Sequence, residues 1–219
     1  FIHSALTKYT AVRDDRLRVD VGRLSFDNPV GLAAGYDKSG RAVDGLASLG
    51  FGHIELGSVS IDPSEGNPRP RLFRLPDDDA IIVHYGLQND GAAAVHDRIS
   101  GRSTDVPVGV NIVKTNRGIA APAESADEII DEYVRAVRVL HDCADYLVLN
   151  LSCPNTGDGR DFFVDAEHTR LLLTALSDTP ISRPVFLKIS PLGGVATIDA
   201  LLQVVDAFPF VSGFIYNLA

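Results

Sequence analysis

A chain of 219 residues, 45% hydrophobic and 22% charged, is long enough for one large domain or two small ones with a sizeable core. Its formal charge of −9 argues against nucleic acid as a partner. The two cysteines, Cys143 and Cys153, form no CxxC motif, which indicates free thiols in a reducing compartment. No apolar run approaches the roughly 18 residues of a membrane span, and no signal-peptide pattern opens the sequence.

The two ends of the sequence are unusual. It starts at Phe1 and contains no methionine, and it stops at Ala219 shortly after the apolar run G-F-I-Y-N. We therefore expect the sequence to be a piece of a longer protein. Residues 1–12 are mildly amphipathic and predict the end of a longer helix. Residues 1–16 are interpreted as the remnant of an N-terminal segment and residues 17–219 as one domain.

The chain then alternates between short apolar runs and helical patterns. Residues 17–21 and 23–26 alternate apolar and polar side chains around Gly22, which predicts a β-hairpin. Apolar runs predict six strands, at residues 29–35, 53–59, 106–113, 146–152, 184–190 and 213–217. Helical spacing predicts helices at residues 41–49, 90–99, 125–142, 166–176 and 197–208, with Ser125 or Asp127 capping the longest. Residues 60–79 hold several prolines and predict a long irregular loop, which is usually functional.

Apolar strands that alternate with helices predict a parallel α/β sheet covered by helices. Two architectures fit this pattern, an open doubly wound sheet and a (β/α)8 barrel. The G-x-G-x-x-G motif of dinucleotide-binding sheets does not follow the first strand. Polar residues close the predicted strands instead, namely Lys38, Ser58, Asn111, Asn150, Lys188 and Asn217. Because a barrel gathers its strand ends round one mouth, the sequence favours a (β/α)8 TIM-type barrel of which about six units are present.

Residues 146–156, Y-L-V-L-N-L-S-C-P-N-T, carry the densest chemistry in the chain. A buried strand ends there in polar residues, which brings Asn150, Ser152, Cys153 and Asn155 to one edge of the sheet. Two carboxamides, a hydroxyl and a thiol offer hydrogen-bonding groups and a proton acceptor in a small volume. The alternative is an ordinary strand-end turn, with the cysteine as a small buried hydrophobe.

Six motifs follow one another in the chain: N-P-V-G-L-A-A-G-Y-D-K-S-G, E-L-G-S-V, E-G-N-P-R-P-R-L-F-R-L, G-V-N-I, N-L-S-C-P-N-T and F-L-K-I-S-P. Together, over about residues 17–217, they resemble the dihydroorotate dehydrogenase family, specifically its quinone-dependent class 2 branch. The resemblance implies a (β/α)8 barrel with FMN across its mouth, oxidation of dihydroorotate to orotate in pyrimidine biosynthesis, and electron transfer to a quinone. It also implies a protein in the cytoplasm or peripheral on the cytoplasmic face of the membrane, contacting it through the N-terminal segment, with no metal ligands.

The resemblance also implies two sets of site residues, carried over position by position. The flavin set is Ala33, Ala34, Gly35, Lys38, Gly57, Ser58, Asn111, Asn150 and Lys188, and the substrate set is Lys38, Asn150, Asn155 and Asn217. Small residues at positions 33–35 let a flat ring approach the backbone, and the alternative is tight packing of strand on helix. Lys188, the lone charge in an apolar strand, is expected to place its ammonium beside the flavin's pyrimidine edge; the alternative is a surface lysine.

Cys153 falls on the position of the family's catalytic base, which removes the C5 proton while hydride leaves C6 for the flavin. Class 2 members usually carry serine there and class 1 members cysteine, so the chain combines a class 2 framework with the class 1 base. A thiol, with a pKa of about 8.5, loses its proton far more readily than a hydroxyl. The resemblance therefore implies the same role with a shifted pH dependence.

The chain departs from the family pattern at two substrate positions. The family's I-N-R-x-G-F-N reads I-V-H-Y-G-L-Q here, with Val83 in place of a substrate-binding asparagine, and the family's T-N-T ends in Leu218. An FMN-dependent oxidoreductase of the same barrel family with a different substrate is therefore an alternative. Two further alternatives are an enzyme that uses Cys153 as a covalent nucleophile beside His84, and a flavin-free paralogue.

Two further expectations concern the electron acceptor and the phosphate. Arg74 matches a family residue near the quinone, and residues 60–79 are expected to pack against the N-terminal segment and form the acceptor's entry. The units that bind the cofactor phosphate in this family would follow the sixth strand, so the sequence does not contain them.

Overall fold

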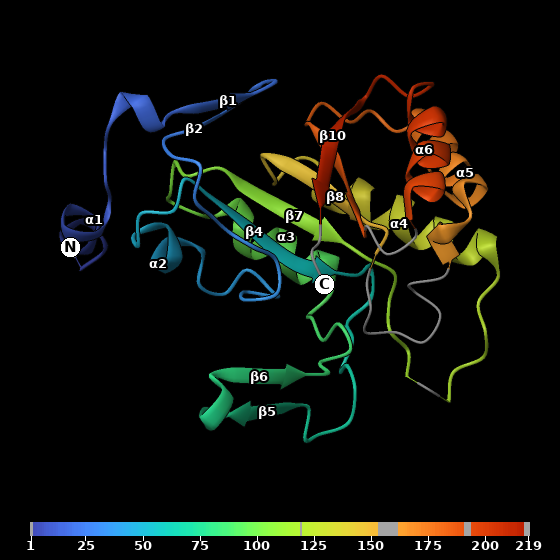
Figure 1. Cartoon of the computed structure of the whole chain (residues 1–219), viewed down its shortest axis with the longest axis horizontal. Helices are drawn as coiled ribbons and strands as arrows, with labels where there is room; N and C mark the ends of the chain where they lie inside the picture. Colours follow the sequence, from blue (N-terminus) through green and yellow to red (C-terminus); the bar gives the residue numbers. More distant parts are fainter. Residues whose placement is uncertain (1, 119, 153–161, 191–193, 217–219) are drawn as a thin grey trace.

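The computed structural model describes residues 2–118, 120–152, 162–190 and 194–216, and Figure 1 shows their arrangement. The helices are α1 (Ile2–Thr10), α2 (Val43–Ala47), α3 (Ala92–Ser100), α4 (Ala126–Leu140), α5 (Ala166–Ser177) and α6 (Gly194–Val205). The strands are β1 (Val19–Val21), β2 (Leu24–Phe26), β3 (Gly31–Leu32), β4 (His53–Val59), β5 (Leu72–Leu75), β6 (Ala80–Val83), β7 (Val108–Ile112), β8 (Tyr146–Asn150), β9 (Val185–Ile189) and β10 (Val211–Tyr216). Short 3-10 helices lie at Asp15–Leu17, Pro76–Asp78 and Phe162–Val164. None of the described helices is both long and apolar enough to cross a bilayer.

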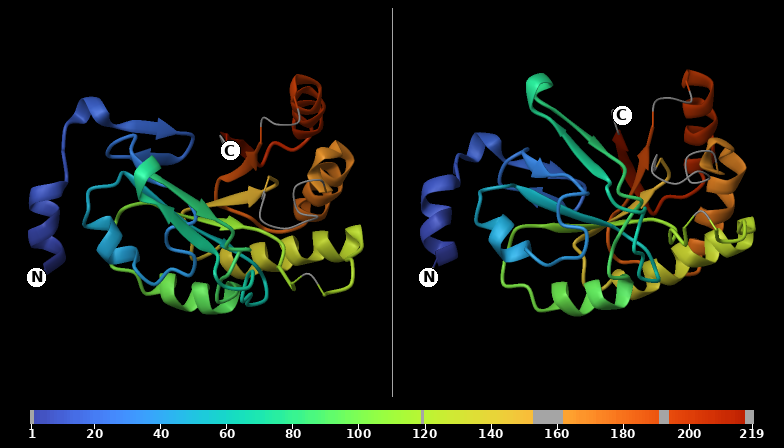
Figure 2. Two further views of the ribbon diagram at one scale, coloured as in Figure 1. Left: turned by 60° about the horizontal axis from the view of Figure 1, so that its bottom comes forward. Right: turned by 90° about the horizontal axis from the view of Figure 1, so that it is seen from below.

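A six-stranded sheet forms the centre of the described chain, in the order β10-β9-β8-β7-β4-β3, and its neighbouring strands run parallel. Helix α3 packs against α4, α4 against α5 and α5 against α6, and Figure 2 shows these helices on one face of a curled sheet. A doubly wound sheet would carry helices on both faces. Strands in chain order with helices outside are the arrangement of a (β/α)8 barrel, so the predicted fold is confirmed with six of its strands present.

Side chains alternate along β8 between an outer core and the barrel interior. In β8 the side chains of Leu147 and Leu149 join the main hydrophobic core, which includes residues of α3, α4 and α5. Tyr146 and Val148, at the alternate positions, pack in a second cluster with Phe186 of β9. Leu24 and Phe26 of β2 complete that second cluster. The predicted N-terminal hairpin, β1–β2, therefore exists and packs its apolar face against the barrel interior at the start of β8.

Close packing in the interior requires glycine at position 109. Gly109 pairs with Tyr146 across β7 and β8. A Cβ at position 109 would lie 2.1 Å from atoms of the Tyr146 ring, far inside van der Waals contact. Burial raises the pKa of the Tyr146 hydroxyl well above its ordinary value of 10.0.

Helix α4 starts where its sequence predicts. Ser125 is the N-cap, its hydroxyl accepts a hydrogen bond from the Glu128 amide, and the Glu128 carboxylate accepts from the Ser125 amide in return. The apolar stripe of the helix faces the sheet, and the hydroxyl of its buried Tyr133 donates to the carbonyl of Asn150 at 2.7 Å. The helix is therefore fixed both at its cap and at the end of β8.

The first predicted strand and helix are both shorter than expected. Residues 29–35 contribute only Gly31–Leu32 as a strand, and residues 41–49 contribute only Val43–Ala47 as a helix. The helix starts late because of Asp37, whose carboxylate accepts backbone N–H groups from Ser39 at 3.2 Å, Arg41 at 3.0 Å and Ala42 at 2.8 Å. These bonds hold residues 37–42 in a turn and delay the start of the helix.

The expectation of a wholly irregular segment at residues 60–79 is wrong. Strands β5 and β6 form an antiparallel hairpin, with Leu72 opposite Val83 and Leu75 opposite Ala80. Asp79 adopts the left-handed conformation, with φ of 48°, at its turn. A run of four residues is too short to reveal a strand by periodicity, and its partner lies beyond residue 79.

Helix α1 does not meet this hairpin, so the expected contact of residues 60–79 with the N-terminal segment is also wrong. The hydroxyl of Thr10, at the end of α1, donates to the carbonyl of Ser48 at 2.7 Å. Figures 1 and 2 show the β5–β6 hairpin well apart from α1 in every view. The N-terminal segment is instead held beside α2, before the start of β4.

Candidate active site

Polar side chains from three neighbouring strands meet inside the barrel. Glu55 of β4, Asn111 of β7 and Asn150 of β8 are each buried, and each strand's adjacent apolar residues point into the outer core. Asn111 Nδ2 donates to Glu55 Oε1 at 2.8 Å, and Asn150 Nδ2 donates to Asn111 Oδ1 at 3.1 Å. Ser58, at the end of β4, donates its hydroxyl to Asn111 Oδ1 at 2.5 Å and accepts from Asn150 Nδ2 at 3.1 Å. Ser58, Asn111 and Asn150 thus form one connected polar network near the carboxyl ends of their strands. Glu55 joins it from deeper in the barrel, because it lies opposite Gly109 near the start of β7.

Lys188 of β9 adds a cation to this network. Its Nζ lies 3.9 Å from Glu55 Oε1, and the two side chains are 14% and 7% exposed respectively. This burial excludes the alternative of a surface lysine. Burial raises the pKa of the Glu55 carboxyl above its ordinary value, while Lys188 and the Asn111 hydrogen bond oppose the rise.

Glu55 is a site residue that the sequence analysis missed. It stands in H-I-E-L-G-S-V, where it is the one carboxylate in an otherwise apolar or small strand. The same signal, a lone charge in a buried strand, singled out Lys188. Applied to both β4 and β9, this signal would have predicted that Glu55 and Lys188 form an ion pair.

A cavity of about 520 Å³ opens beside the turn that follows β3, and its walls include Gly35, Lys38, Arg71, Tyr85 and Gln88. Lys38 Nζ donates to the Gly35 carbonyl at 2.7 Å and lies 5.0 Å from the centre of the Tyr85 ring. The guanidinium of Arg71 lies 5.9 Å from the same ring. Gln88 Oε1 is buried and accepts no hydrogen bond from any described residue. The cavity lining therefore includes cations close to an aromatic ring and an available acceptor, together with the carboxylates of Asp37, Glu65 and Asp90.

The turn that lines this cavity is tied to the strand that carries Glu55. The amide of Gly57 donates to the Asp37 carbonyl at 3.0 Å. A Cβ at Gly57 would lie 2.6 Å from the backbone oxygen of Asn111, so only glycine fits between β4 and β7 here.

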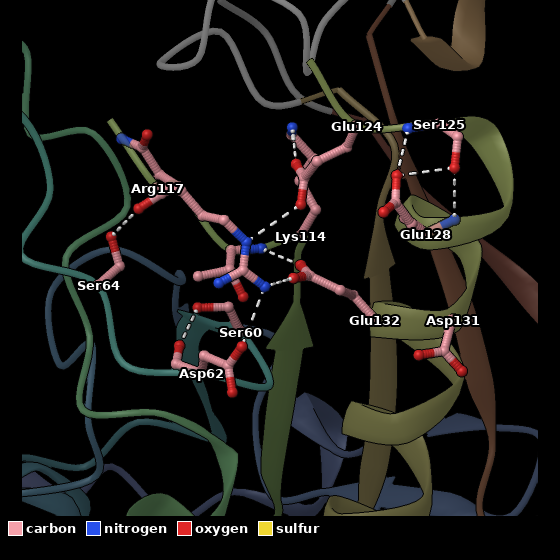
Figure 3. A network of polar contacts seen from close by, with 12 residues as sticks. Ser60, Asp62, Ser64, Lys114, Arg117, Glu124, Ser125, Glu128, Asp131 and Glu132 are labelled. Atoms are coloured by element: carbon pink, nitrogen blue, oxygen red, sulfur yellow. Dashed lines mark hydrogen bonds and ion pairs between the residues drawn. The ribbon is translucent and has the colours of Figure 1, made fainter. Parts of the chain in front are cut away.

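A second network ties together the loops that follow β4 and β7 (Figure 3). Arg117 Nη2 contacts Asp62 Oδ2 at 3.0 Å and also Glu132 of α4, and its Nε contacts Glu124 at 3.2 Å. Glu124 in turn pairs with Lys114 at 2.7 Å. The segment after β7 is thus fixed both to the segment after β4 and to helix α4.

The sequence-predicted site residues fall into four groups. Gly57, Ser58, Asn111, Asn150 and Lys188 lie in or directly beside the inner network, and Gly35 and Lys38 line the cavity. Ala33 and Ala34 follow β3 directly, where Ala33 is exposed. Cys153, Asn155 and Asn217 lie outside the described residues, as does Leu218. Val83 is exposed at the end of β6, and the neighbouring Tyr85 lines the cavity instead.

The chain resembles known proteins over most of its length. Residues 16–217 match the family model for dihydroorotate dehydrogenase. The dihydroorotate dehydrogenase (quinone) of Mycolicibacterium smegmatis is 41% identical over 190 residues, covering 87% of this chain and 51% of the relative. That of Corynebacterium glutamicum is 44% identical over 201 residues (91% and 52%), and the mitochondrial protein of Mus musculus is 43% identical over 199 residues (85% and 48%). The chain spans about half the length of the curated relatives it matches.

Solved structures show the same likeness. Ligand-free DHODH from Eimeria tenella matches with a TM-score of 0.80 and 28% identity, covering 99% of this chain and 68% of that one. DHODH from Eimeria tenella in complex with ferulenol matches with a TM-score of 0.77 and 28% identity, covering 100% and 65%. On its motifs, its barrel strands and these comparisons, the chain belongs to the dihydroorotate dehydrogenase family.

Proposed function

We propose that this protein is an FMN-dependent dihydroorotate dehydrogenase, which oxidises dihydroorotate to orotate in pyrimidine biosynthesis and passes the electrons to a quinone. The observation that carries the proposal is the row of inward-facing polar side chains, Glu55, Asn111, Asn150 and Lys188, on four adjacent strands. Active sites of (β/α)8 barrels lie at the carboxyl ends of their strands. The curated relatives, each named dihydroorotate dehydrogenase (quinone), support the same activity.

The chemistry of the inner network fits FMN. The pyrimidine edge of the flavin ring offers carbonyl and N–H groups, which an ammonium and carboxamides bind well. Lys188 supplies the ammonium, and Asn111 and Asn150 supply the carboxamides. The apolar side chains of Val148 and Phe186 pack in the same interior. We assign to the flavin site Ala33, Ala34, Gly35, Lys38, Gly57, Ser58, Asn111, Asn150 and Lys188. Bound FMN supplies the hydride acceptor.

The cavity beside the flavin residues fits a small anionic ring. Dihydroorotate carries a carboxylate and ring amides, so it needs a cation and hydrogen-bonding partners. Lys38 and Arg71 line the cavity, and the buried Gln88 Oε1 is available to accept a ring N–H. We assign Lys38 to the carboxylate, and Asn150, Asn155 and Asn217 to the ring.

Cys153 is proposed as the base that takes the C5 proton. It follows Ser152, which is buried and whose amide donates to Asn150 Oδ1 at 3.2 Å, so the chain up to that point is held against the inner network. A thiolate is accessible near neutral pH, whereas a serine hydroxyl is far harder to deprotonate.

The experiment that tests this function is stopped-flow reduction of the bound flavin by dihydroorotate across pH. Wild-type protein is compared with Cys153→Ser and Cys153→Ala. The serine variant should bind FMN and orotate but be reduced more slowly, with its pH profile moved to higher pH, and the alanine variant should be slower still. An unshifted pH profile of flavin reduction in Cys153→Ser would exclude Cys153 as the base. A protein that purifies without flavin would refute the whole proposal.

The quinone is proposed to enter near Arg74 of β5, and the N-terminal segment is proposed to bring the protein to the cytoplasmic face of a membrane. Arg74 is exposed on the hairpin, in an acidic protein of formal charge −9. Arg74→Ala should slow reoxidation of the flavin by a quinone and spare its reduction. Slower reduction with normal reoxidation would contradict this placement.

A second candidate function keeps the flavin and changes the substrate. Val83 favours it, because it replaces a substrate-binding asparagine of the family pattern and is 44% exposed on the hairpin. Flavin reduction by dihydroorotate is then compared with reduction by other dihydropyrimidines. A faster rate with a dihydropyrimidine that lacks the carboxylate would favour this second function.

A further inference from the structure

Three metal-ligating side chains converge on the outer helix layer, far from the barrel mouth. His96 lies in α3, and Asp142 and Cys143 follow the end of α4. One ligand atom from each, an imidazole nitrogen, a carboxylate oxygen and the thiol sulfur, all lie within 4.8 Å of one another. His96 Nε2 is 3.2 Å from Asp142 Oδ1. Because α3 packs against α4, two elements that are distant in sequence build this cluster together (Figure 2).

We propose that His96, Asp142 and Cys143 form a binding site for a borderline-soft divalent transition metal, with Zn²⁺ as the natural occupant. Imidazole and thiolate select Zn²⁺ over the hard cations Mg²⁺ and Ca²⁺, which prefer oxygen ligands only. Zinc bonds of about 2.0–2.3 Å place ligand atoms roughly 3.3–3.8 Å apart, so the observed spread must close by about 1 Å. The His96 and Asp142 ligand atoms already lie 3.2 Å apart, so the closure brings these two atoms and the Cys143 thiol together.

The surroundings of the cluster hold its ligands in place. The buried Cys143 lies in the turn after α4, and its backbone carbonyl accepts a hydrogen bond from Arg102 Nη1 at 2.5 Å. Arg102 follows α3 and also pairs with Asp145 at 2.8 Å, so it ties the turn after α4 to the end of α3. His96 Nδ1 lies 3.5 Å from Asp97 Oδ1, and a carboxylate beside the second imidazole nitrogen is common at metal sites.

The location predicts a stabilising role, not a catalytic one. Cys143 stands just before Tyr146, which begins β8, so the cluster lies at the opposite end of the strand from Asn150. Three protein ligands with one exposed carboxylate leave a coordination position for water. A metal bound there would cross-link α3 to the end of α4, and the inference is independent of the proposed enzyme activity.

The test is titration of the chelator-treated protein with Co²⁺, followed by difference absorbance against the same protein without cobalt. Cys153→Ser serves as the background, because it leaves Cys143 as the one thiol in the chain. We expect one Co²⁺ per chain, with a thiolate-to-cobalt charge-transfer band that Zn²⁺ abolishes by displacement. Cys143→Ser in this background should lose the band, and His96→Ala should weaken binding at least tenfold, or about 1.4 kcal/mol.

A matched histidine outside the cluster provides the control. His84 is exposed on the segment after β6, and His84→Ala should bind Co²⁺ like the background protein. Zn²⁺ should also raise the melting temperature of the background and of His84→Ala, but not that of His96→Ala. Absence of the charge-transfer band in the background protein, or its retention in Cys143→Ser, would overturn the proposal. Circular dichroism of each variant confirms that a lost band reflects the site and not unfolding.

Discussion

Replacement of Arg117 by alanine is expected to cost about 2–3 kcal/mol of folding free energy. Arg117 contacts Glu132, whose side chain is 5% exposed, and Asp62 and Glu124 at 3.0 and 3.2 Å. Without the guanidinium, Glu132 keeps the amide of Thr115, at 2.6 Å, as a partner. Removing one partner of a fully buried ion pair costs about 3–5 kcal/mol. The Arg117 side chain is 42% exposed, so solvent reduces this cost, and the equally exposed Asp62 adds only a few tenths of a kcal/mol.

Equilibrium urea unfolding of wild type and Arg117→Ala measures this loss. In a domain of this size it corresponds to a fall in melting temperature of roughly 5–10 °C. Arg135→Ala is the matched control, because Arg135 pairs with Asp131 on the same helix at 3.6 Å with both side chains about half exposed or more. The control should lose about 0.5 kcal/mol or less.

A double-mutant cycle with Glu132→Gln separates the pair from the rest of the network. If the buried carboxylate is the source of the cost, Arg117→Ala should destabilise the Glu132→Gln background much less than it destabilises wild type. A loss in Arg117→Ala no larger than in Arg135→Ala, or an equal loss in both backgrounds, would refute the reasoning.

Three other variants test the barrel interior. Lys188→Ala should fold but release flavin or stall its reduction, and full occupancy with unchanged reduction, measured by flavin absorbance, would remove Lys188 from the site. Burial holds the pKa of Glu55 above its ordinary value of 4.5, so the free energy of unfolding should fall as pH rises above that value. Between about pH 4 and 8, the free energy of unfolding of Glu55→Gln should therefore depend less on pH than that of wild type. Gly109→Ala should lose about 1–3 kcal/mol or more in urea unfolding, because its Cβ meets the Tyr146 ring. Gly45→Ala, where a Cβ meets nothing within 4 Å, should be neutral or gain up to about 1 kcal/mol, and equal losses at both glycines would contradict the packing argument.

The sequence predicts those features that depend on local pattern. Strand β4 has the predicted bounds, His53–Val59, because its start follows a glycine-containing turn at residues 50–52 and its end precedes a polar, proline-containing segment. The start of helix α4 after Ser125 is predictable because the two residues of its capping box, Ser125 and Glu128, lie within four consecutive positions. Lys188 was predicted to point inward because a lone charge in a buried strand needs a partner inside the barrel. The roles of all the predicted site residues remain predictions, and Cys153, Asn155 and Asn217 also lie outside the described residues.

Only the tertiary structure decides which distant residues meet. Periodicity shows that a residue is buried, but the register between strands determines which residue it contacts. The contact of Lys188 with Glu55 therefore forms only once β9, β8, β7 and β4 lie side by side. The β5–β6 hairpin depends in the same way on pairing between two runs of four residues, each too short to be recognised alone. The sequence by itself thus determined the barrel and the cap of helix α4, because the burial pattern of a strand and the residues of a cap are both local. The ion pairs, the β5–β6 hairpin and the cluster of His96, Asp142 and Cys143 were decided by packing, because their members are brought together only by the path of the whole chain.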